Sequence, residues 1–240
     1  MPNIVITGGS CGFGKAMTHE FCKKKNNVLI AGRSVKPLLE TKYQMYHNTQ
    51  GHCFHKQCNV QNKDDLVSLA DYAQEVFDGK IDHWINNAGV CEGPEDFHHI
   101  SLEDLGNVLQ TNILGVALGT KIAQNIQCDN IYAISGHGSD FMKTPDFALY
   151  GASKACVSHF YSSIIEETNK SLNSKSKFHI IAPGIMKSKL SKRLLEDEDI
   201  NSVTKYFISV LAQDPSDVAA KVVPKILAIS GNGNTIRPIF

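Results

Sequence analysis

Short apolar segments alternate with amphipathic helical patterns along most of the chain. The predicted strands are residues 4–6, 28–31, 53–57, 81–85, 131–134 and 178–182. The predicted helices are 15–25, 35–47, 62–78, 102–127 and 148–172, with helical pieces at 187–195, 201–211 and 215–229. This alternation predicts a doubly wound α/β fold, in which helices cover both faces of a parallel sheet of about seven strands.

The chain of 240 residues contains no internal repeat and no linker rich in Pro, Gly or Ser. Residues 1–240 are therefore expected to form one domain. Loops at the carboxyl ends of the strands, chiefly 89–99, 136–147 and 185–212, are expected to build the substrate pocket.

The composition of the chain argues against several classes of binding partner. The 24 Lys and Arg residues balance 24 Asp and Glu residues, which argues against binding to nucleic acid or an anionic membrane. No apolar run approaches the ~18 residues needed to span a bilayer. The seven cysteines are scattered, so reduced thiols are expected. Only three residues precede the first strand, which leads us to expect no leader peptide and a cytoplasmic protein.

A glycine-rich segment, Thr7–Lys15, joins the first strand to the first helix. Glycines there allow a phosphate to approach the amides at the start of a helix. A P-loop would need Ser or Thr after Lys15, where Ala16 stands, and the common G-x-G-x-x-G pattern would need glycine at Met17. The remaining pattern is TGxxxGxG.

This glycine pattern resembles the coenzyme loop of the short-chain dehydrogenase/reductase family. Four further segments occur in the order and spacing typical of that family: Asn86–Gly89, Asn112–Gly115, Tyr150–Lys154 and Pro183–Ser188. The resemblance covers nearly the whole chain. It implies a Rossmann-like sheet, a nicotinamide coenzyme and an oxidoreductase that acts on CH-OH or C=O groups of a small molecule.

The end of the second predicted strand bears on the choice of coenzyme. Sites selective for NAD place a carboxylate about 20 residues past the glycines, whereas a 2′-phosphate calls for arginine. Here Gly32 stands where the acid is expected and Arg33 follows it. The guanidinium fork matches a phosphate, so NADP(H) is favoured over NAD(H).

The resemblance also assigns coenzyme contacts residue by residue. Asn59 replaces the aspartate usual at the adenine, and Ser188 stands where threonine is usual. The implied contacts are Gly8, Ser10, Cys11, Gly12, Phe13, Gly14, Arg33, Ser34, Asn59, Val60, Asn87, Ala88, Gly89, Tyr150, Lys154, Pro183, Gly184, Ile185 and Ser188.

Tyr150 and Lys154 carry the chemistry that the resemblance implies. Their i, i+4 spacing places both on one helix face, where an ammonium favours the phenolate and eases proton exchange. Tyr150 would exchange a proton with the substrate oxygen, and Lys154 would also hold the nicotinamide ribose. Asn112 would anchor a water that relays protons to Lys154.

The family's serine, which hydrogen-bonds the substrate carbonyl, has no direct counterpart, because His137 stands at its usual position. Ser135 and Ser139 are the two alternatives. The segment Gly136–Ser139 and the nearby Thr144-Pro145 resemble one branch of the family, the chlorophyll(ide) b reductase-like proteins. That likeness favours Ser139 over Ser135, with His137 as a further contact.

No metal site is expected. His52, Cys53, His55 and Cys58 have metal-like composition, but His52 and Cys58 face away from the other two on a strand. The function predicted is hydride transfer between NADP(H) and a carbonyl or alcohol substrate. The alternative is a catalytically weak or inactive NADP(H)-binding regulatory protein. The family resemblance also implies a homodimer or homotetramer.

Overall fold

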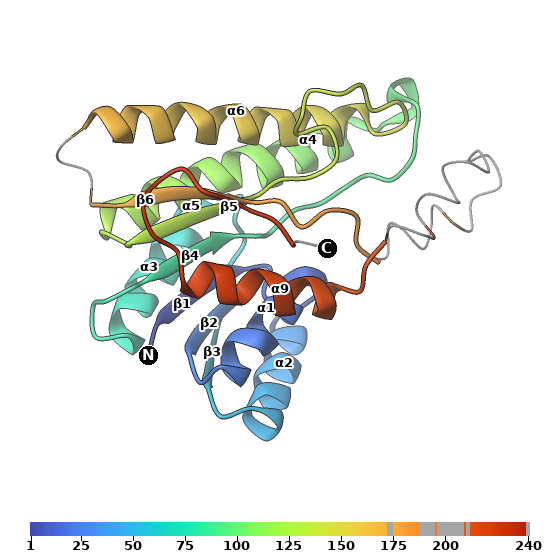
Figure 1. Ribbon diagram of the computed structural model, residues 1–240. Helices are drawn as coiled ribbons and strands as arrows, with labels where there is room; N and C mark the ends of the chain where they lie inside the picture. Colours follow the sequence, from blue (N-terminus) through green and yellow to red (C-terminus); the bar gives the residue numbers. More distant parts are fainter. Residues whose placement is uncertain (172–174, 188–194, 196–208, 210–211, 239–240) are drawn as a thin grey trace.

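The computed structural model describes residues 1–171, 175–187, 195, 209 and 212–238 (Figure 1). The strands are β1 (Asn3–Thr7), β2 (Asn27–Gly32), β3 (His52–Gln57), β4 (His83–Asn86), β5 (Asn130–Ile134), β6 (Lys177–Ile181) and β7 (Thr235–Ile236). The α-helices are α1 (Gly12–Lys23), α2 (Val35–Asn48), α3 (Lys63–Val76), α4 (Leu102–Leu109), α5 (Gly115–Asn125), α6 (Ala148–Lys170) and α9 (Pro215–Leu227). A 3₁₀ turn, η1 (Phe97–His99), and a π-helical turn, η2 (Gln110–Leu114), complete the described elements.

The strands form one parallel sheet in the order β3-β2-β1-β4-β5-β6-β7. The order reverses direction between β1 and β4, and the loops that leave their carboxyl ends diverge there. In open α/β sheets such a switch point forms the ligand crevice. The predicted Rossmann-like, doubly wound fold is confirmed.

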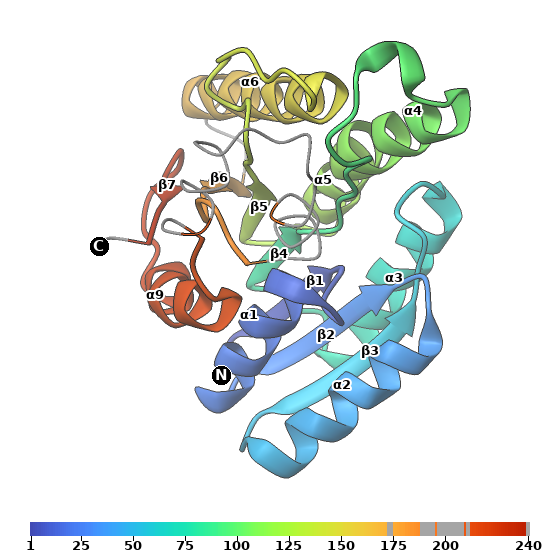
Figure 2. The same cartoon turned by 90° about the vertical axis from the view of Figure 1, so that its right-hand side faces the viewer.

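Alternating side chains on the strands divide the core into two layers. On β1, Ile4 and Ile6 pack with α1 and α9, whereas Val5 packs on the opposite face with α3, α5 and α6. Figures 1 and 2 show the same division, with α1, α2 and α9 on one side of the sheet and α3, α5 and α6 on the other. Because helices cover both faces, the edge where the strands end is the part of the sheet that a ligand can approach.

Three details differ from the sequence prediction. The helix expected at 102–127 is three segments, α4, η2 and α5, and the first helix begins at Gly12 rather than at residue 15. The two-residue strand β7 was not located in the sequence. The helical pieces expected at 187–195 and 201–211 lie largely outside the described residues.

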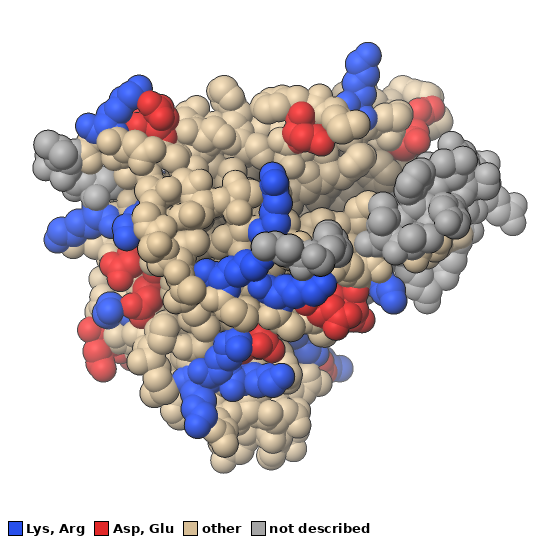
Figure 3. Space-filling view, in the orientation of Figure 1, with Lys and Arg blue, Asp and Glu red and all other residues tan. Residues whose placement is uncertain are grey.

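Charges of both signs are interspersed on the face shown in Figure 3, in keeping with equal numbers of acidic and basic residues. Among the described residues, no helix combines the length and apolar character required to cross a bilayer.

Candidate active site

The glycine loop forms a tight turn between β1 and α1. Gly8 and Gly12 have φ values of +68° and +49°, a region that favours glycine. A Cβ at Gly14 would collide with the Gly8 carbonyl oxygen, so the helix can start this close to the strand only with glycine there. Cys11 is the N-cap residue of α1, and within the described part of the chain its side chain caps none of the first amides. Those amides suit a phosphate.

Thr7 and Asn87 join the loop to the end of β4. The Thr7 hydroxyl oxygen accepts hydrogen bonds from the backbone N–H groups of Asn87 and Ala88, both at 3.1 Å. The Asn87 amide donates to the Thr7 and Gly8 carbonyls at 3.0 and 3.2 Å. The predicted contacts Gly8, Asn87 and Ala88 therefore lie together at the switch point of the sheet.

The carboxyl end of β2 forms the neighbouring corner. Arg33 is exposed there, and Gln57 donates to its carbonyl oxygen at 2.9 Å, which fixes the backbone. A Cβ at Gly32 would lie 3.5 Å from the Ser10 hydroxyl. Ser10 and Arg33 thus come from different segments to one corner, beside the exposed Ser34.

Asn59 and Val60 follow β3. The Asn59 N–H donates to Asp65 at 2.8 Å, and its side-chain oxygen accepts from the Gln61 N–H at 3.2 Å. Val60 is buried against Gly115, where an added Cβ would come within 2.9 Å of the valine. These contacts hold the loop in place at the edge where the adenine contact was predicted.

Tyr150 and Lys154 lie one turn apart in α6, with the Lys154 nitrogen 5.6 Å from the centre of the tyrosine ring. Lys154 is buried and donates to the Ile134 carbonyl at 3.1 Å. A Cβ on Gly89 would lie 3.8 Å from the Lys154 nitrogen, so the loops after β4 and β5 both reach this pair.

Burial controls the protonation of both groups. It lowers the pKa of Lys154 to about 8, and it raises the pKa of Tyr150 above its ordinary value, with smaller contributions from Cys91 and Glu92. The sequence led us to expect that the ammonium would lower the pKa of Tyr150. In the structure burial instead raises the pKa of Tyr150, which favours the phenol.

Gly136 is a site residue that the sequence analysis did not assign. A Cβ there would lie 2.7 Å from the Tyr150 hydroxyl. Ser135 precedes Gly136 at the end of β5, and Ser139 closes a turn in which its N–H donates to the Gly136 carbonyl at 3.0 Å. Among the described residues, neither serine side chain hydrogen-bonds Tyr150. His137 is exposed and faces the Phe147 ring.

Asn112 lies in η2 rather than in a continuous α-helix. Its side chain accepts from the Val90 N–H at 2.9 Å and donates to the Val90 carbonyl at 2.8 Å and to the Ser153 hydroxyl at 3.1 Å. It therefore clamps the loop after β4 to α6. This structural role was not expected for a residue predicted to anchor a water.

Pro183, Gly184 and Ile185 follow β6. Gly184 has a φ of +79°, and Ile185 is 45% exposed. The Ile185 carbonyl accepts from the Gln213 N–H at 3.0 Å, which holds this segment to the start of the C-terminal part. The predicted contact Ser188 and most of the 185–212 loop lie outside the described residues.

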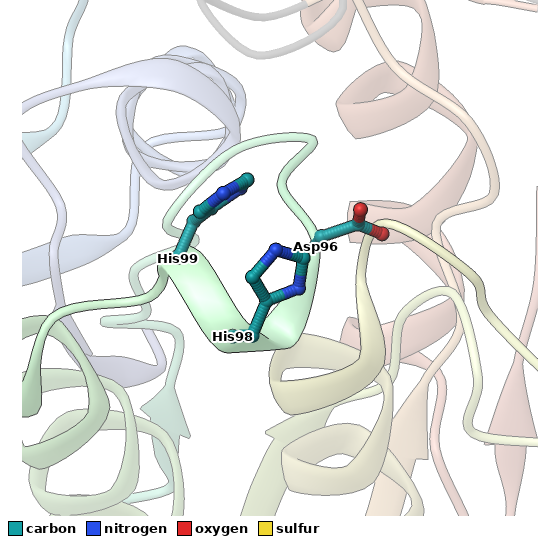
Figure 4. Close-up of side chains that lie close together, drawn as sticks. All are labelled: Asp96, His98 and His99. Atoms are coloured by element: carbon teal, nitrogen blue, oxygen red, sulfur yellow. The ribbon is translucent and has the colours of Figure 1, made fainter.

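One cluster of potential metal ligands occurs within the described ranges of the chain. Asp96, His98 and His99 lie on and beside η1, with their ligand atoms within 4.8 Å of one another (Figure 4). All three side chains are exposed, so water competes with any ion on every side. The cluster differs from the His52, Cys53, His55 and Cys58 set weighed in the sequence.

The fold and this edge define a dinucleotide-binding oxidoreductase of the Rossmann type. The family model described as short chain dehydrogenase matches residues 2–199, and the chain belongs to that family. A solved alcohol dehydrogenase from Thermococcus sibiricus, complexed with 5-hydroxy-NADP, shares the fold with a TM-score of 0.78. It is 17% identical, and the alignment covers 99% of this chain and 95% of that one.

Two curated relatives from plants match almost the whole chain. The chain is 35% identical to chlorophyll(ide) b reductase NOL of Arabidopsis thaliana, over 99% of this chain and 68% of that protein. It is 30% identical to the probable chlorophyll(ide) b reductase NYC1 of Oryza sativa subsp. japonica, over 98% of this chain and 49% of that protein. The chain thus spans half to two thirds of these relatives.

These relatives correct the expected location. NOL and NYC1 from both plants are chloroplastic proteins, which contradicts the expectation of a cytoplasmic protein. The expectation of a cytoplasmic protein was wrong because it rested on the few residues before β1, and those residues do not carry that conclusion.

Proposed function

We propose that the chain is an NADP(H)-dependent oxidoreductase that transfers a hydride between the nicotinamide and a carbonyl or alcohol substrate. The observation that carries the proposal is the pairing of the half-buried Tyr150 with the buried Lys154, one turn apart in α6, at the carboxyl ends of β4 and β5. A phenol and an amine held side by side in a low-dielectric crevice suit proton exchange with a substrate oxygen.

The residues present fit a dinucleotide. The turn through Gly8, Gly12 and Gly14 brings backbone close to the first amides of α1, where a pyrophosphate is favoured. Arg33 and Ser10 offer charge and a hydroxyl to a 2′-phosphate at the adjoining corner, which supports NADP(H) over NAD(H). When bound, the coenzyme supplies or accepts the hydride.

Each side chain then has a defined task in the reduction. Tyr150, held as a phenol by burial, donates its proton to the carbonyl oxygen. Lys154, whose pKa is about 8, stabilises the tyrosinate that remains until a proton from solvent restores the phenol, and it is positioned to bind the nicotinamide ribose. Ser139 is favoured over Ser135 as the hydroxyl that polarises the carbonyl, on the likeness to the chlorophyll(ide) b reductases.

Turnover tests the proposal. Purified protein is mixed with NADPH and a panel of aldehydes, ketones and quinones, including formyl groups on bulky ring systems because two relatives carry chlorophyll(ide) b reductase names. Consumption of NADPH with any member is the expected result. Binding of NADPH without consumption across the panel would contradict the proposal.

The substitution Tyr150→Phe isolates the proton donor. Removing the hydroxyl is expected to lower kcat at least 100-fold, within the usual range for a general acid, while leaving the Kd for NADPH nearly unchanged. Fluorescence titration gives the Kd, and NADPH absorbance gives kcat. Tyr161→Phe provides a matched control in the same helix, since Tyr161 bonds Thr120 within the core. Retained turnover in Tyr150→Phe would refute the assignment.

A second candidate function is an NADP(H)-binding regulatory protein with little or no turnover. The observation that favours it is Gly136, which places no hydroxyl beside Tyr150. The same panel of substrates separates the two functions.

We also propose a homodimer or homotetramer, supported by Leu109 and Leu114, which are 38% and 46% exposed along α4 and η2.

A further inference from the structure

Two cysteines from different elements meet on the face of the sheet that carries α1 and α9. Cys22 stands in the last turn of α1, and Cys53 is the second residue of β3. Both pack in the same core layer, where Cys22 is buried and Cys53 is half-buried. The two side chains are hydrogen-bond partners of each other. The fold therefore brings two free thiols into contact.

The backbone of this region lets the two segments approach closely. A Cβ at Gly51 would lie 2.7 Å from the Cys22 Cα atom, so the chain can enter β3 this near to α1 only with glycine there. The Cys22 thiol also donates to the carbonyl oxygen of His52, the residue before Cys53, at 4.0 Å. A disulfide needs Cα atoms within about 7 Å of each other, and this close approach favours such a distance.

The register of the sheet fixes the direction of the Cys53 side chain. Cys53 is paired with Val28 of β2, and paired residues of neighbouring parallel strands point to the same face of a sheet. Val28 is buried in the core layer on the α1 side. Cys53 therefore points toward α1 and not toward α3 on the opposite face.

A metal site does not explain the contact between the two thiols. A structural zinc site needs four ligands, and in the part of the chain that the structure describes no third His, Cys, Asp or Glu ligand atom joins this pair within 4.8 Å. Two thiols in contact without further ligands suit a different chemistry, the formation of a disulfide.

The two thiols differ in their access to a reagent from solvent. The hydrogen bond with Cys53 and burial raise the pKa of the Cys22 thiol. The thiolate is the nucleophile in disulfide exchange, and access also controls the rate. Cys53, which is half-buried at the beginning of an edge strand, is therefore the thiol that reacts first, and Cys22 is the thiol that follows.

We propose that Cys22 and Cys53 are a redox-active pair, which a low-molecular-weight disulfide converts to an intramolecular disulfide between α1 and β3. Cys53 loses its proton and attacks one sulfur of the reagent, whose S–S bond breaks and releases one thiol. Cys22 then loses its proton and attacks the Cys53 sulfur, which forms the protein disulfide and releases the second thiol. The cysteines lose two electrons, and the reagent gains them.

The disulfide would stabilise the fold without reaching the coenzyme corner. It closes a loop that contains β2 and α2, and a closed loop lowers the conformational entropy of the unfolded chain. The pair lies at the amino ends of β2 and β3, whereas Arg33 follows the carboxyl end of β2, about 16 Å along the strand from Val28. The inference therefore does not rest on the proposed function.

Peptide mapping tests the linkage directly. Reduced protein is incubated with glutathione disulfide, the remaining free thiols are blocked with iodoacetamide, and the protein is digested without reduction. Mass spectrometry is expected to find the peptides of Cys22 and Cys53 joined to each other. The exposed Cys11 and Cys156 are expected to carry glutathione instead, which shows that the reagent was active.

Thermal unfolding measures the effect on stability. The midpoint is expected to rise by about 5–10 °C on oxidation and to return when dithiothreitol is added. Cys53→Ser changes a half-buried position and should show neither the linkage nor the rise. Cys22→Ala keeps the thiol that reacts first, so Cys53 should carry glutathione as a mixed disulfide in this variant.

Cys128→Ala is the matched control, because Cys128 is also buried but belongs to the core layer on the opposite face. It should form the same linkage and show the same rise as the parent protein. Absence of the joined peptide in a sample whose Cys11 carries glutathione would overturn the inference. A joined peptide without a rise in the midpoint, or an equal rise in Cys53→Ser, would also overturn it. None of these measurements depends on turnover of NADPH.

Discussion

Arg33 lies exposed at the corner where β2 ends, with Ser10 beside it and no carboxylate at Gly32. A charged hydrogen bond from arginine to a phosphate contributes about 1.5–3 kcal/mol, which is roughly 10-fold to 100-fold in Kd. We expect Arg33→Ala to weaken NADPH binding by that factor and to leave NADH binding nearly unchanged, as measured by fluorescence titration.

Arg237→Ala serves as the control for this change. Arg237 is also exposed, but it follows β7, at the opposite end of the sheet from β2. The charge of the protein changes equally in both variants, so only a local contact can distinguish them. Equal losses of NADPH and NADH affinity in Arg33→Ala would contradict the assigned coenzyme preference.

Gly136 limits the space beside the Tyr150 hydroxyl. A methyl group from Gly136→Ala would lie 2.7 Å from that oxygen, so the tyrosine tip must move. A small displacement of a reacting group can cost about 100-fold in rate, and we expect kcat to fall at least tenfold with little change in NADPH affinity. The assay is NADPH consumption with the best substrate of the panel.

Gly106→Ala in α4 is the matched glycine control, since an added Cβ there meets nothing within 4 Å. That change should leave kcat unaltered and stabilise the helix by about 0.5–1 kcal/mol. If Gly136→Ala retained the full kcat, the crevice beside Tyr150 would be wider than the contacts of Gly136 indicate.

At the scale of elements, Asn112 joins three parts of the fold. Its amide bonds both backbone groups of Val90 and the Ser153 hydroxyl, so it couples η2, the loop after β4 and α6. Asn112→Ala would leave buried polar groups without partners, at about 1–3 kcal/mol each. We expect the free energy of unfolding to fall by about 2–4 kcal/mol in urea titrations.

Asn125→Ala, at the exposed end of α5, removes the same amide where water replaces it. Its free energy of unfolding should remain within about 0.5 kcal/mol of the parent value. A comparably small effect in Asn112→Ala would mean that the clamp on Val90 contributes little to stability.

The elements show how far the sequence could be interpreted. β1, β2 and β5 carry clear apolar runs. The motifs at the carboxyl ends of the strands placed the glycine turn between β1 and α1, and Tyr150 and Lys154 on α6. The break at Gln110–Leu114 was missed because its residues keep an amphipathic pattern while the hydrogen bonding changes to a π-turn. β7 was missed because two residues are too few to show the alternation of apolar and polar positions that marks a strand.

The path of the loop before α6, residues 135–147, could not be predicted from the sequence, for a different reason. Its path depends on positive φ values at Gly138, Phe141 and Asp146, two of which are not glycines. Tertiary packing imposes these conformations, and sequence spacing does not reveal them. The approach of Gly136 to Tyr150 and the hydrogen bond from the Tyr150 N–H to Glu92 are contacts between distant segments, so only the folded chain exposes them.

At the scale of the whole molecule, two buried histidines link stability to pH. The His83 Nδ1 atom lies 2.9 Å from the Tyr132 hydroxyl, and His179 stacks on the same ring and lies 3.2 Å from Asn130. Burial lowers the pKa of each histidine from 6.5 to about 4. The folded protein therefore binds fewer protons than the unfolded chain between these pH values.

This sign makes stability rise with pH in that window. The contribution is complete above pH 6.5 and is lost as the pH falls toward about 4, by a few kcal/mol in total. Urea unfolding at about pH 7, 5.5 and 4.5, which span this window, measures how the free energy of unfolding changes with pH.

His83→Asn removes one titrating ring while keeping an amide near Tyr132, so the slope should flatten. His47→Asn, an exposed position on α2, should leave it unchanged. A slope that is equally steep in His83→Asn would assign the acid sensitivity to carboxylates elsewhere.

The reversal of strand order between β1 and β4 divides the crevice into two arms. One arm, built from β1 to β3, holds the corner of Arg33, and the other, built from β4 to β6, holds Tyr150 and its supports. Changes in sites without shared neighbours add in free energy. A substitution that changes coenzyme preference on one arm is therefore expected to leave the catalytic activity of Tyr150 on the other arm unchanged. Substitutions at the hydrogen-bonded pair Thr7 and Asn87, which joins the two arms, are expected to affect both.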